Sequence, residues 1–154
     1  KGNGPFLESD PPSPINIYGK SKLGGEQAVL EECPNALVIR TNFFGLSSTS
    51  LGSFTEWILY GLKNRLERKL FCDVYFSPLL IETLVSHVTQ LIKNDASGLF
   101  NVAGPEQLTK YQFGMKLSRA FGYSTDLIEK AALADRADLC VRPHRLKIHL
   151  VNLK

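Results

Sequence analysis

A tyrosine and a lysine four residues apart are the side chains with the clearest chemical use. Tyr18 and Lys22 belong to the segment Tyr-Gly-Lys-Ser-Lys, and helical spacing would place both side chains on one face. A phenol is a poor proton donor or acceptor at neutral pH, but an adjacent ammonium group favours the phenolate. A phenol tuned in this way can pass a proton to a carbonyl oxygen while a hydride reaches the carbon.

Alternating helical and extended patterns surround this pair. They predict helices over 16–32, 54–66, 81–93 and 109–121, and short strands over 36–40, 70–75 and 99–102. Pro34 ends the first helix because it has no backbone N–H, and Thr109 with Gln112 matches a capping box. Strands that alternate with helices indicate an α/β fold with a parallel or mixed sheet.

Composition narrows the possible partners. The 154 residues are 44% hydrophobic and 21% charged, with a formal net charge of +3, which excludes collagen, coiled coils and low-complexity disorder. The densest basic stretch, residues 63–69, is interrupted by Glu67, so no nucleic acid is expected. The cysteines and histidines lack metal-ligand spacing, so no metal is expected. Because no apolar run approaches the roughly 20 residues that cross a bilayer, we expect a cytoplasmic protein without a membrane partner.

Both ends of the sequence favour a fragment of a longer chain. Residues 1–17 hold four of the eight prolines and no initiator methionine, and residues 146–154 alternate apolar and basic residues without a turn or cap. A domain rarely begins with a long Pro-rich loop unless something upstream anchors it. We therefore expect an incomplete sheet with an unpaired edge, which invites association.

The flanks of Tyr18 make the motif more specific. From Glu8 to Glu26 the sequence reads E-x-D-x-x-x-P-x-N-x-Y-G-K-S-K-L-x-G-E. This string resembles the active-site helix of the extended short-chain dehydrogenase/reductase family, and in particular its dTDP-4-dehydrorhamnose reductase branch with the RmlD-like substrate-binding domain. Residues 38–45, 71–78, 98–104 and 142–143 are similar to later segments of that branch, in the same order. Without these flanks, a Tyr-x-x-x-Lys pair is ordinary helix surface.

The resemblance implies a partial Rossmann-like doubly wound sheet with a small α/β substrate-binding domain. Residues 1–70 would hold the active-site helix and the last elements of the Rossmann-like domain, and 71–154 mostly the substrate-binding domain, interleaved with the sheet. The family's glycine-rich pyrophosphate turn has no counterpart in these 154 residues, nor has the Ser/Thr of its Ser/Thr–Tyr–Lys set. The N-terminal cofactor half is therefore expected to be missing, and the 154 residues alone are not expected to catalyse.

The same resemblance implies a reaction for the intact protein. It would reduce a 4-keto nucleotide sugar with NADPH or NADH, with Tyr18 donating the proton and Lys22 tuning it and holding the nicotinamide ribose. The cofactor-binding residues implied are Tyr18, Lys22, Arg40, Thr41 and Asn42. The substrate-binding residues implied are Asn42, Phe43, Pro78 and Arg142. From spacing alone, Arg40 and Asn42 at the end of a strand are at least as well explained by a structural role.

Two other functions stay open. One is a nucleotide-sugar epimerase or dehydratase of the same superfamily with tightly held NAD. The other is a non-catalytic regulatory subunit, because the same branch resembles the β subunit of methionine adenosyltransferase, which keeps the fold and serves as a binding partner. The expected partners are a nucleotide-sugar substrate and a second copy of the protein in a homodimer.

Overall fold

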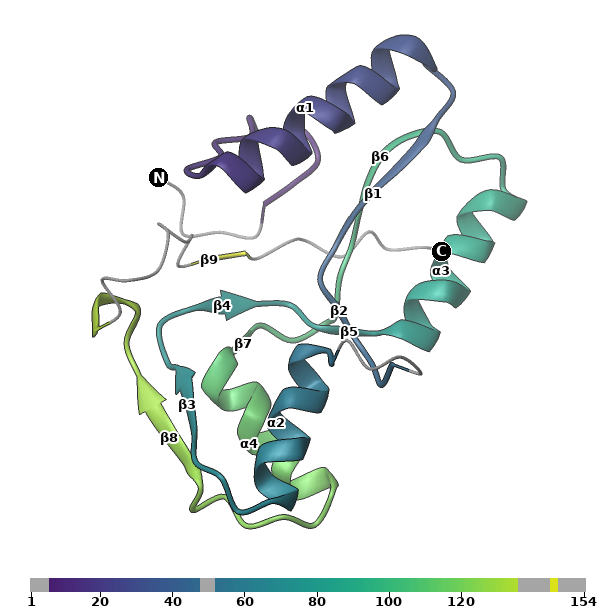
Figure 1. Cartoon of the computed structure of the whole chain (residues 1–154). Helices are drawn as coiled ribbons and strands as arrows, with labels where there is room; N and C mark the ends of the chain where they lie inside the picture. Colours follow the sequence, from purple (N-terminus) through teal and green to yellow (C-terminus); the bar gives the residue numbers. More distant parts are fainter. Residues whose placement is uncertain (1–5, 48–51, 136–144, 147–154) are drawn as a thin grey trace.

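The computed structural model describes residues 6–47, 52–135 and 145–146. Figure 1 shows α1 above a strand pair, α3 beside that pair, and the remaining helices and strands below. The chain order is α1 (Ile17–Glu32), β1 (Leu37–Thr41), β2 (Phe43–Phe44), α2 (Phe54–Lys63), β3 (Arg68–Phe71), β4 (Tyr75–Phe76), β5 (Leu79–Leu80), α3 (Ile81–Lys93), β6 (Gly98–Val102), β7 (Leu108–Thr109), α4 (Lys110–Ala120), β8 (Ile128–Ala131), η1 (Leu133–Asp135) and β9 (Arg145–Leu146). The α/β fold predicted from the sequence is confirmed.

Polar caps start the helices where the sequence provides them. Asn16 caps α1, and its side-chain oxygen accepts a hydrogen bond from the Gly19 backbone N–H at 2.8 Å. At the start of α4, Thr109 and Gln112 exchange both hydrogen bonds of the expected capping box. These caps satisfy N–H groups that would otherwise lack partners, so they fix where each helix begins.

The strands β1 and β6 form a parallel pair that lies between two helices. Leu37 pairs with Gly98 and Thr41 with Val102. On one face, Leu37 and Ile39 belong to an apolar cluster with Leu84 and Leu91 of α3. Because side chains alternate along a strand, Arg40 points to the opposite face, where it meets α1. Helices on both faces of a parallel pair are what a doubly wound sheet requires (Figure 1).

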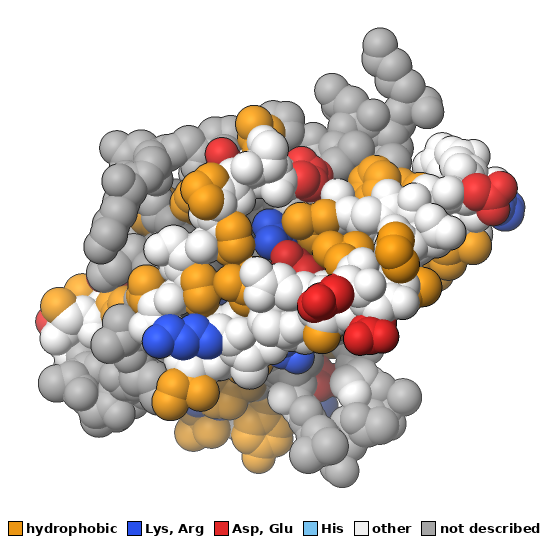
Figure 2. All heavy atoms as spheres, turned by 90° about the horizontal axis from the view of Figure 1, so that it is seen from above, with side chains coloured by type: hydrophobic (Ala, Val, Ile, Leu, Met, Phe, Trp, Pro, Cys, Tyr) orange, Lys and Arg blue, Asp and Glu red, His pale blue; other side chains and the backbone are white. Residues whose placement is uncertain are grey.

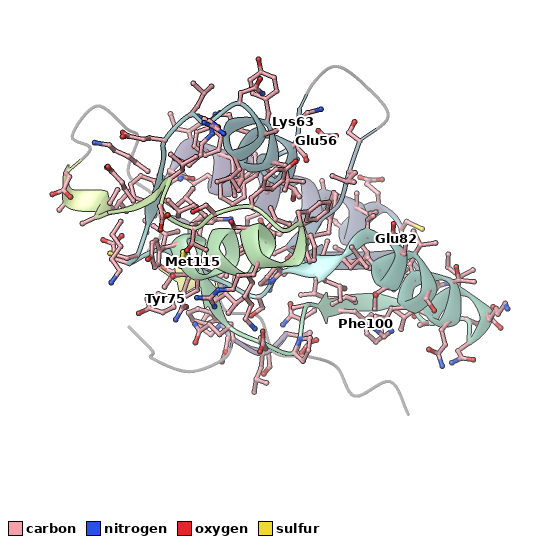
Figure 3. The ribbon with its side chains drawn as sticks, turned by 90° about the horizontal axis from the view of Figure 1, so that it is seen from below. Glu56, Lys63, Tyr75, Glu82, Phe100 and Met115 are labelled. Atoms are coloured by element: carbon pink, nitrogen blue, oxygen red, sulfur yellow. The ribbon has the colours of Figure 1, made fainter. Side chains whose placement is uncertain are left out.

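A second core lies below this pair. Its buried side chains come from α2, β3, β4, α4 and β8, and they are Ile58, Leu62, Leu70, Phe76, Phe113, Leu117 and Ile128. Figure 3, seen from below, shows α2 beside α4 at this core. Gly114 allows α4 to pack closely on β3, because a Cβ there would lie 2.2 Å from Cδ1 of Leu70. The packing thus groups α2 and β3 with α4, and α3 and β6 with β1, so the chain is interleaved. The division at residue 70 stays a prediction.

The sequence predicted one continuous strand over 70–75, and this prediction is wrong. The structure has β3 and β4 separated by a bend, because the chain moves from one strand partner to another. β3 pairs in parallel with β8, whereas β4 pairs antiparallel with β7 and in parallel with β9. Asp73 holds the bend, since both of its carboxylate oxygens accept a hydrogen bond from the Leu133 N–H, at 3.0 and 2.9 Å. A run of apolar residues cannot reveal such a change of partner.

Polar contacts hold α1 to the sheet. The structure classes no side chain of α1 as buried. Arg40 of β1 donates from Nε to Glu26 Oε2 at 2.8 Å and from Nη2 to Glu26 Oε1 at 2.5 Å. The two side chains are only 26% and 15% exposed. A bidentate ion pair that is largely shielded from water fixes both the distance between its two side chains and their relative orientation. It therefore sets where α1 lies on β1.

A double-mutant cycle on this pair tests that role. We expect Glu26→Gln and Arg40→Met each to lower the free energy of unfolding by about 1–2 kcal/mol, between the values for exposed and buried pairs. The double variant should lose clearly less than the two single losses combined, because the second change removes the charge that the first left unpaired. Denaturant unfolding of the four proteins measures this. Additive losses would contradict the assignment.

A second test concerns Glu56 in the first turn of α2 (Figure 3). Its carboxylate accepts hydrogen bonds from the backbone N–H groups of Ser53 and Ser47, which hold the pKa of Glu56 below its ordinary value of 4.5. Because the folded-state pKa lies below the unfolded-state value, the carboxylate stabilises the fold above pH 4.5. This stabilisation is lost as the pH falls through the folded-state pKa. We therefore expect Glu56→Gln to have a lower melting temperature than the parent at neutral pH, and the difference to be smaller in acid. Thermal unfolding at both pH values measures this.

Glu67→Gln is the matched control for that measurement, because Glu67 is an exposed glutamate just beyond α2. It should unfold like the parent at both pH values. A difference between Glu56→Gln and the parent that stayed constant on acidification would show that the charge of Glu56 is not what stabilises α2.

Candidate active site

Tyr18 and Lys22 lie side by side on the first two turns of α1. The Lys22 Nζ is 5.5 Å from the centre of the Tyr18 ring, as four-residue spacing on a helix predicts. Tyr18 is 70% exposed. Figure 2, which looks down on the α1 side of the molecule, shows hydrophobic side chains reaching this face among charged ones. The phenol and the ammonium group are thus both open to a ligand that approaches α1.

Arg40 occupies the end of β1 and faces α1. Its guanidinium is engaged by Glu26, one helical turn after Lys22, and the sequence analysis did not identify Glu26 as its partner. Helical spacing places Glu26 near Lys22 on α1, but it carries no information about a partner on β1. The contact gives Arg40 a structural role, and its contact with a cofactor stays a prediction.

The next three residues of the chain have different environments. The Thr41 hydroxyl is buried and has no hydrogen-bond partner among the described residues. The backbone oxygen of Asn42 accepts a hydrogen bond from the Leu79 N–H at 2.9 Å, which ties the end of β1 to β5. Phe43 is 60% exposed. A buried hydroxyl and an exposed aromatic ring at the carboxyl end of a parallel strand lie where ligands bind in open α/β sheets.

Pro78 directly precedes Leu79, whose N–H donates to Asn42. It borders a cavity of about 300 Å³ whose other lining residues are Phe44, Pro105, Glu106, Leu108, Phe113, Lys116, Leu117 and Ala120. Glu106 and Lys116 form an ion pair, and they are the charged members of this lining. Pro78 is also tightly placed, since a Cβ on Gly104 would lie 1.9 Å from its carbonyl oxygen. The cavity does not include Tyr18 or Lys22, and the sequence analysis did not foresee it.

Three further expectations from the sequence concern Arg142, metal binding and membrane crossing. Arg142 lies outside the described residues, so its role at the substrate stays a prediction. Among the described residues, no three His, Cys, Asp or Glu side chains gather as a metal site would need. In the same part of the chain, no helix combines the length and the apolar character needed to cross a membrane.

Comparison with known proteins places these features in a family. The family model described as the RmlD substrate binding domain matches residues 1–154. A probable low-salt glycan biosynthesis reductase, Agl14 of Haloferax volcanii, is 32% identical over 155 residues, covering 99% of this chain and 52% of that protein. The β subunit of methionine adenosyltransferase 2 of Rattus norvegicus is 32% identical over 141 residues, covering 77% of this chain and 38% of that protein. The chain thus spans about half or less of these relatives.

A solved structure supports the same relationship. The crystal structure of dTDP-4-dehydrorhamnose reductase from Bacillus anthracis, in complex with NADP, superposes with a TM-score of 0.81 at 25% identity. The superposition covers 89% of this chain and 48% of that one. The Rossmann-like α/β fold expected from the resemblance is therefore confirmed. Since the family model spans every residue, the chain belongs to the RmlD substrate binding domain family.

Proposed function

We propose that the protein that carries this chain is an oxidoreductase that reduces a 4-keto nucleotide sugar with a nicotinamide cofactor. The observation that carries the proposal is the Tyr18–Lys22 pair, exposed and side by side at the start of α1 in a chain of this family. Reduction of a ketone needs a hydride at carbon and a proton at oxygen. The pair supplies the second requirement, because a phenol beside an ammonium group is suited to proton transfer.

The side-by-side geometry of the pair supports a distinct role for each residue. Tyr18 would hold the proton on its phenol oxygen and release it to the keto oxygen. Lys22 would favour the negative charge that is left on that oxygen, because its ammonium group lies beside the ring. The Glu26–Arg40 pair would keep both side chains in place, since it fastens the same helix to β1. Orientation of this kind is a large part of what an enzyme contributes to a proton transfer.

The described residues fit part of a nicotinamide cofactor site. When bound, such a cofactor supplies the hydride. Tyr18 and Lys22 offer exposed donors for ribose hydroxyls, and the unpartnered Thr41 hydroxyl offers a further polar group at the carboxyl end of β1. The contacts with the cofactor that we propose are Tyr18, Lys22, Arg40, Thr41 and Asn42. The proposed cofactor is NADPH or NADH, and the Bacillus anthracis reductase is a complex with NADP.

A second candidate function is a regulatory subunit. The 32% identity to the β subunit of methionine adenosyltransferase 2 favours it, because that name describes a subunit. The two candidates differ in what Tyr18 does. A reductase needs the Tyr18 phenol for turnover, whereas a purely regulatory subunit has no turnover to lose. The substrate contacts proposed at Asn42, Phe43, Pro78 and Arg142 belong to the reductase alone.

Replacement of the phenol tests the proposal. In the intact protein, we expect Tyr18→Phe to lower kcat for a 4-keto nucleotide sugar by roughly a hundredfold or more, because the proton donor is lost. Cofactor affinity should be nearly unchanged, since the ring and Lys22 remain. Steady-state oxidation of the reduced cofactor, followed by its absorbance, gives kcat, and equilibrium titration gives the affinity.

Tyr60→Phe is the matched control, because Tyr60 is a 63% exposed tyrosine on α2 and not part of the pair. It should turn over like the parent. Turnover of Tyr18→Phe equal to that of the parent would refute the proposed role. An intact protein that oxidises no reduced cofactor with any 4-keto nucleotide sugar would favour the regulatory candidate.

A further inference from the structure

The segment that leads into α1 is held by a strand from the other half of the chain. Between Phe6 and Asn16 the chain forms no helix and only an isolated bridge at Phe6. Proline occupies positions 11, 12 and 14, which limits the shapes that this segment can take. Because α1 follows directly and has no buried side chain, the place where this segment is fixed decides where the first turn of α1 lies.

Asn101 of β6 provides the fixed point. It is 2% exposed, and its backbone N–H donates to Glu8 Oε1 at 2.8 Å. Its side-chain amide Nδ2 donates to the Phe6 backbone oxygen at 3.1 Å. These contacts join residues 93 and 95 positions apart. A carboxylate that accepts from a buried backbone N–H makes a strong hydrogen bond, and losing it would leave that N–H without a partner.

A tight turn restrains the backbone of Glu8. Asp10 accepts a hydrogen bond from the Leu7 N–H at 2.7 Å through Oδ2, and its own N–H donates to the Leu7 oxygen at 3.2 Å. Glu8 lies inside this turn, so its backbone has little freedom. The turn and the prolines at 11, 12 and 14 therefore restrict the chain between Asn101 and the first turn of α1.

The attachments of α1 and of its lead-in segment stand side by side on the sheet. Asn101 is the register partner of Arg40 in the parallel β1–β6 pair, so both side chains face α1. Arg40 holds the middle of the helix through Glu26, and Asn101 holds the segment before the helix through Glu8 and Phe6. Neighbouring positions of one strand pair thus restrain both the helix and the segment before it.

We propose that Glu8 and Asn101 are positioning residues for Tyr18: their hydrogen bonds hold the lead-in segment on β6 and so place the phenol for proton transfer. This inference rests on the proposed reductase function. Neither residue need touch the substrate. Loss of the contact should therefore lower kcat while leaving KM for the sugar nucleotide nearly unchanged, because binding groups stay in place while the proton donor is displaced.

Glu8→Ala and Glu8→Gln in the intact protein test the inference. Glu8→Ala removes the acceptor, and a misplaced proton donor should lower kcat by roughly ten- to a hundredfold. Glu8→Gln keeps an oxygen that can accept from the Asn101 N–H, so it should restore most of the loss. Glu31→Ala, at an exposed glutamate in the last turn of α1, is the control and should behave like the parent. Steady-state kinetics and melting temperatures are measured for all variants.

Several outcomes would overturn the inference. They are a kcat for Glu8→Ala equal to that of the parent, a change in KM alone, and a failure of Glu8→Gln to restore kcat. Should Glu8→Ala not fold, Asn101→Leu decides, since it removes the donor to Phe6 at similar volume and should lower kcat in the same way. Tyr18→Phe is assayed in parallel. If it is fully active, the reductase function itself fails and this inference falls with it; if only the Glu8 and Asn101 variants are fully active, the inference alone fails.

Discussion

The ion pair between Glu26 and Arg40 is the contact on which the arrangement of the candidate site depends. Helices usually stay in place on a sheet because they bury an apolar stripe, but α1 buries no side chain among those described. Its half-buried positions, Gly19, Leu23, Glu26 and Leu30, follow helical spacing and form the face toward the strands. One of the four is the carboxylate of Glu26. Its bidentate ion pair with Arg40 therefore holds the helix on the sheet, as apolar packing does in other helices.

A helix held by polar contacts suits the chemistry proposed for it. The face toward the strands holds Gly19, Leu23, Glu26 and Leu30, which leaves the side of Tyr18 and Lys22 open. Tyr18 stays 70% exposed with the Lys22 ammonium beside it. The strand pair that holds α1 is itself well supported, since β1 and β6 pair over five positions and pack on α3. The position of the phenol is thus set by residues that the substrate need not touch.

The elements that local rules govern were predictable from the sequence. The helix from Ile17 to Glu32 begins at its Asn16 cap and ends before Pro34, and the Thr109–Gln112 capping box starts α4 as expected. A second capping box, Ser53 with Glu56, has the same spacing and was overlooked. β8 also went unnoticed, because Ile128–Ala131 alternates little and becomes a strand only through pairing with β3. Tertiary pairing of this kind leaves no local signal.

The candidate site was predictable in its chemistry and less so in its contacts. The Tyr18–Lys22 spacing follows from helical geometry, and the flanking motif pointed to the family to which the chain belongs. The engagement of Arg40 by Glu26, and of Asn101 by Glu8, joins residues far apart in sequence, and spacing carries no information about such pairs. The cavity beside Pro78 likewise arises only when α4 packs near the chain between β4 and β5.

Deuterium transfer tests the central claim most directly. The intact protein would be mixed with a dTDP-4-keto sugar and a nicotinamide cofactor deuterated at its reducing position, and the product sugar analysed by mass spectrometry and NMR. If the intact protein is a sugar reductase, the product holds one deuterium on the former keto carbon, and one cofactor is oxidised per sugar. A sugar returned without deuterium, with the cofactor still reduced, would contradict the account.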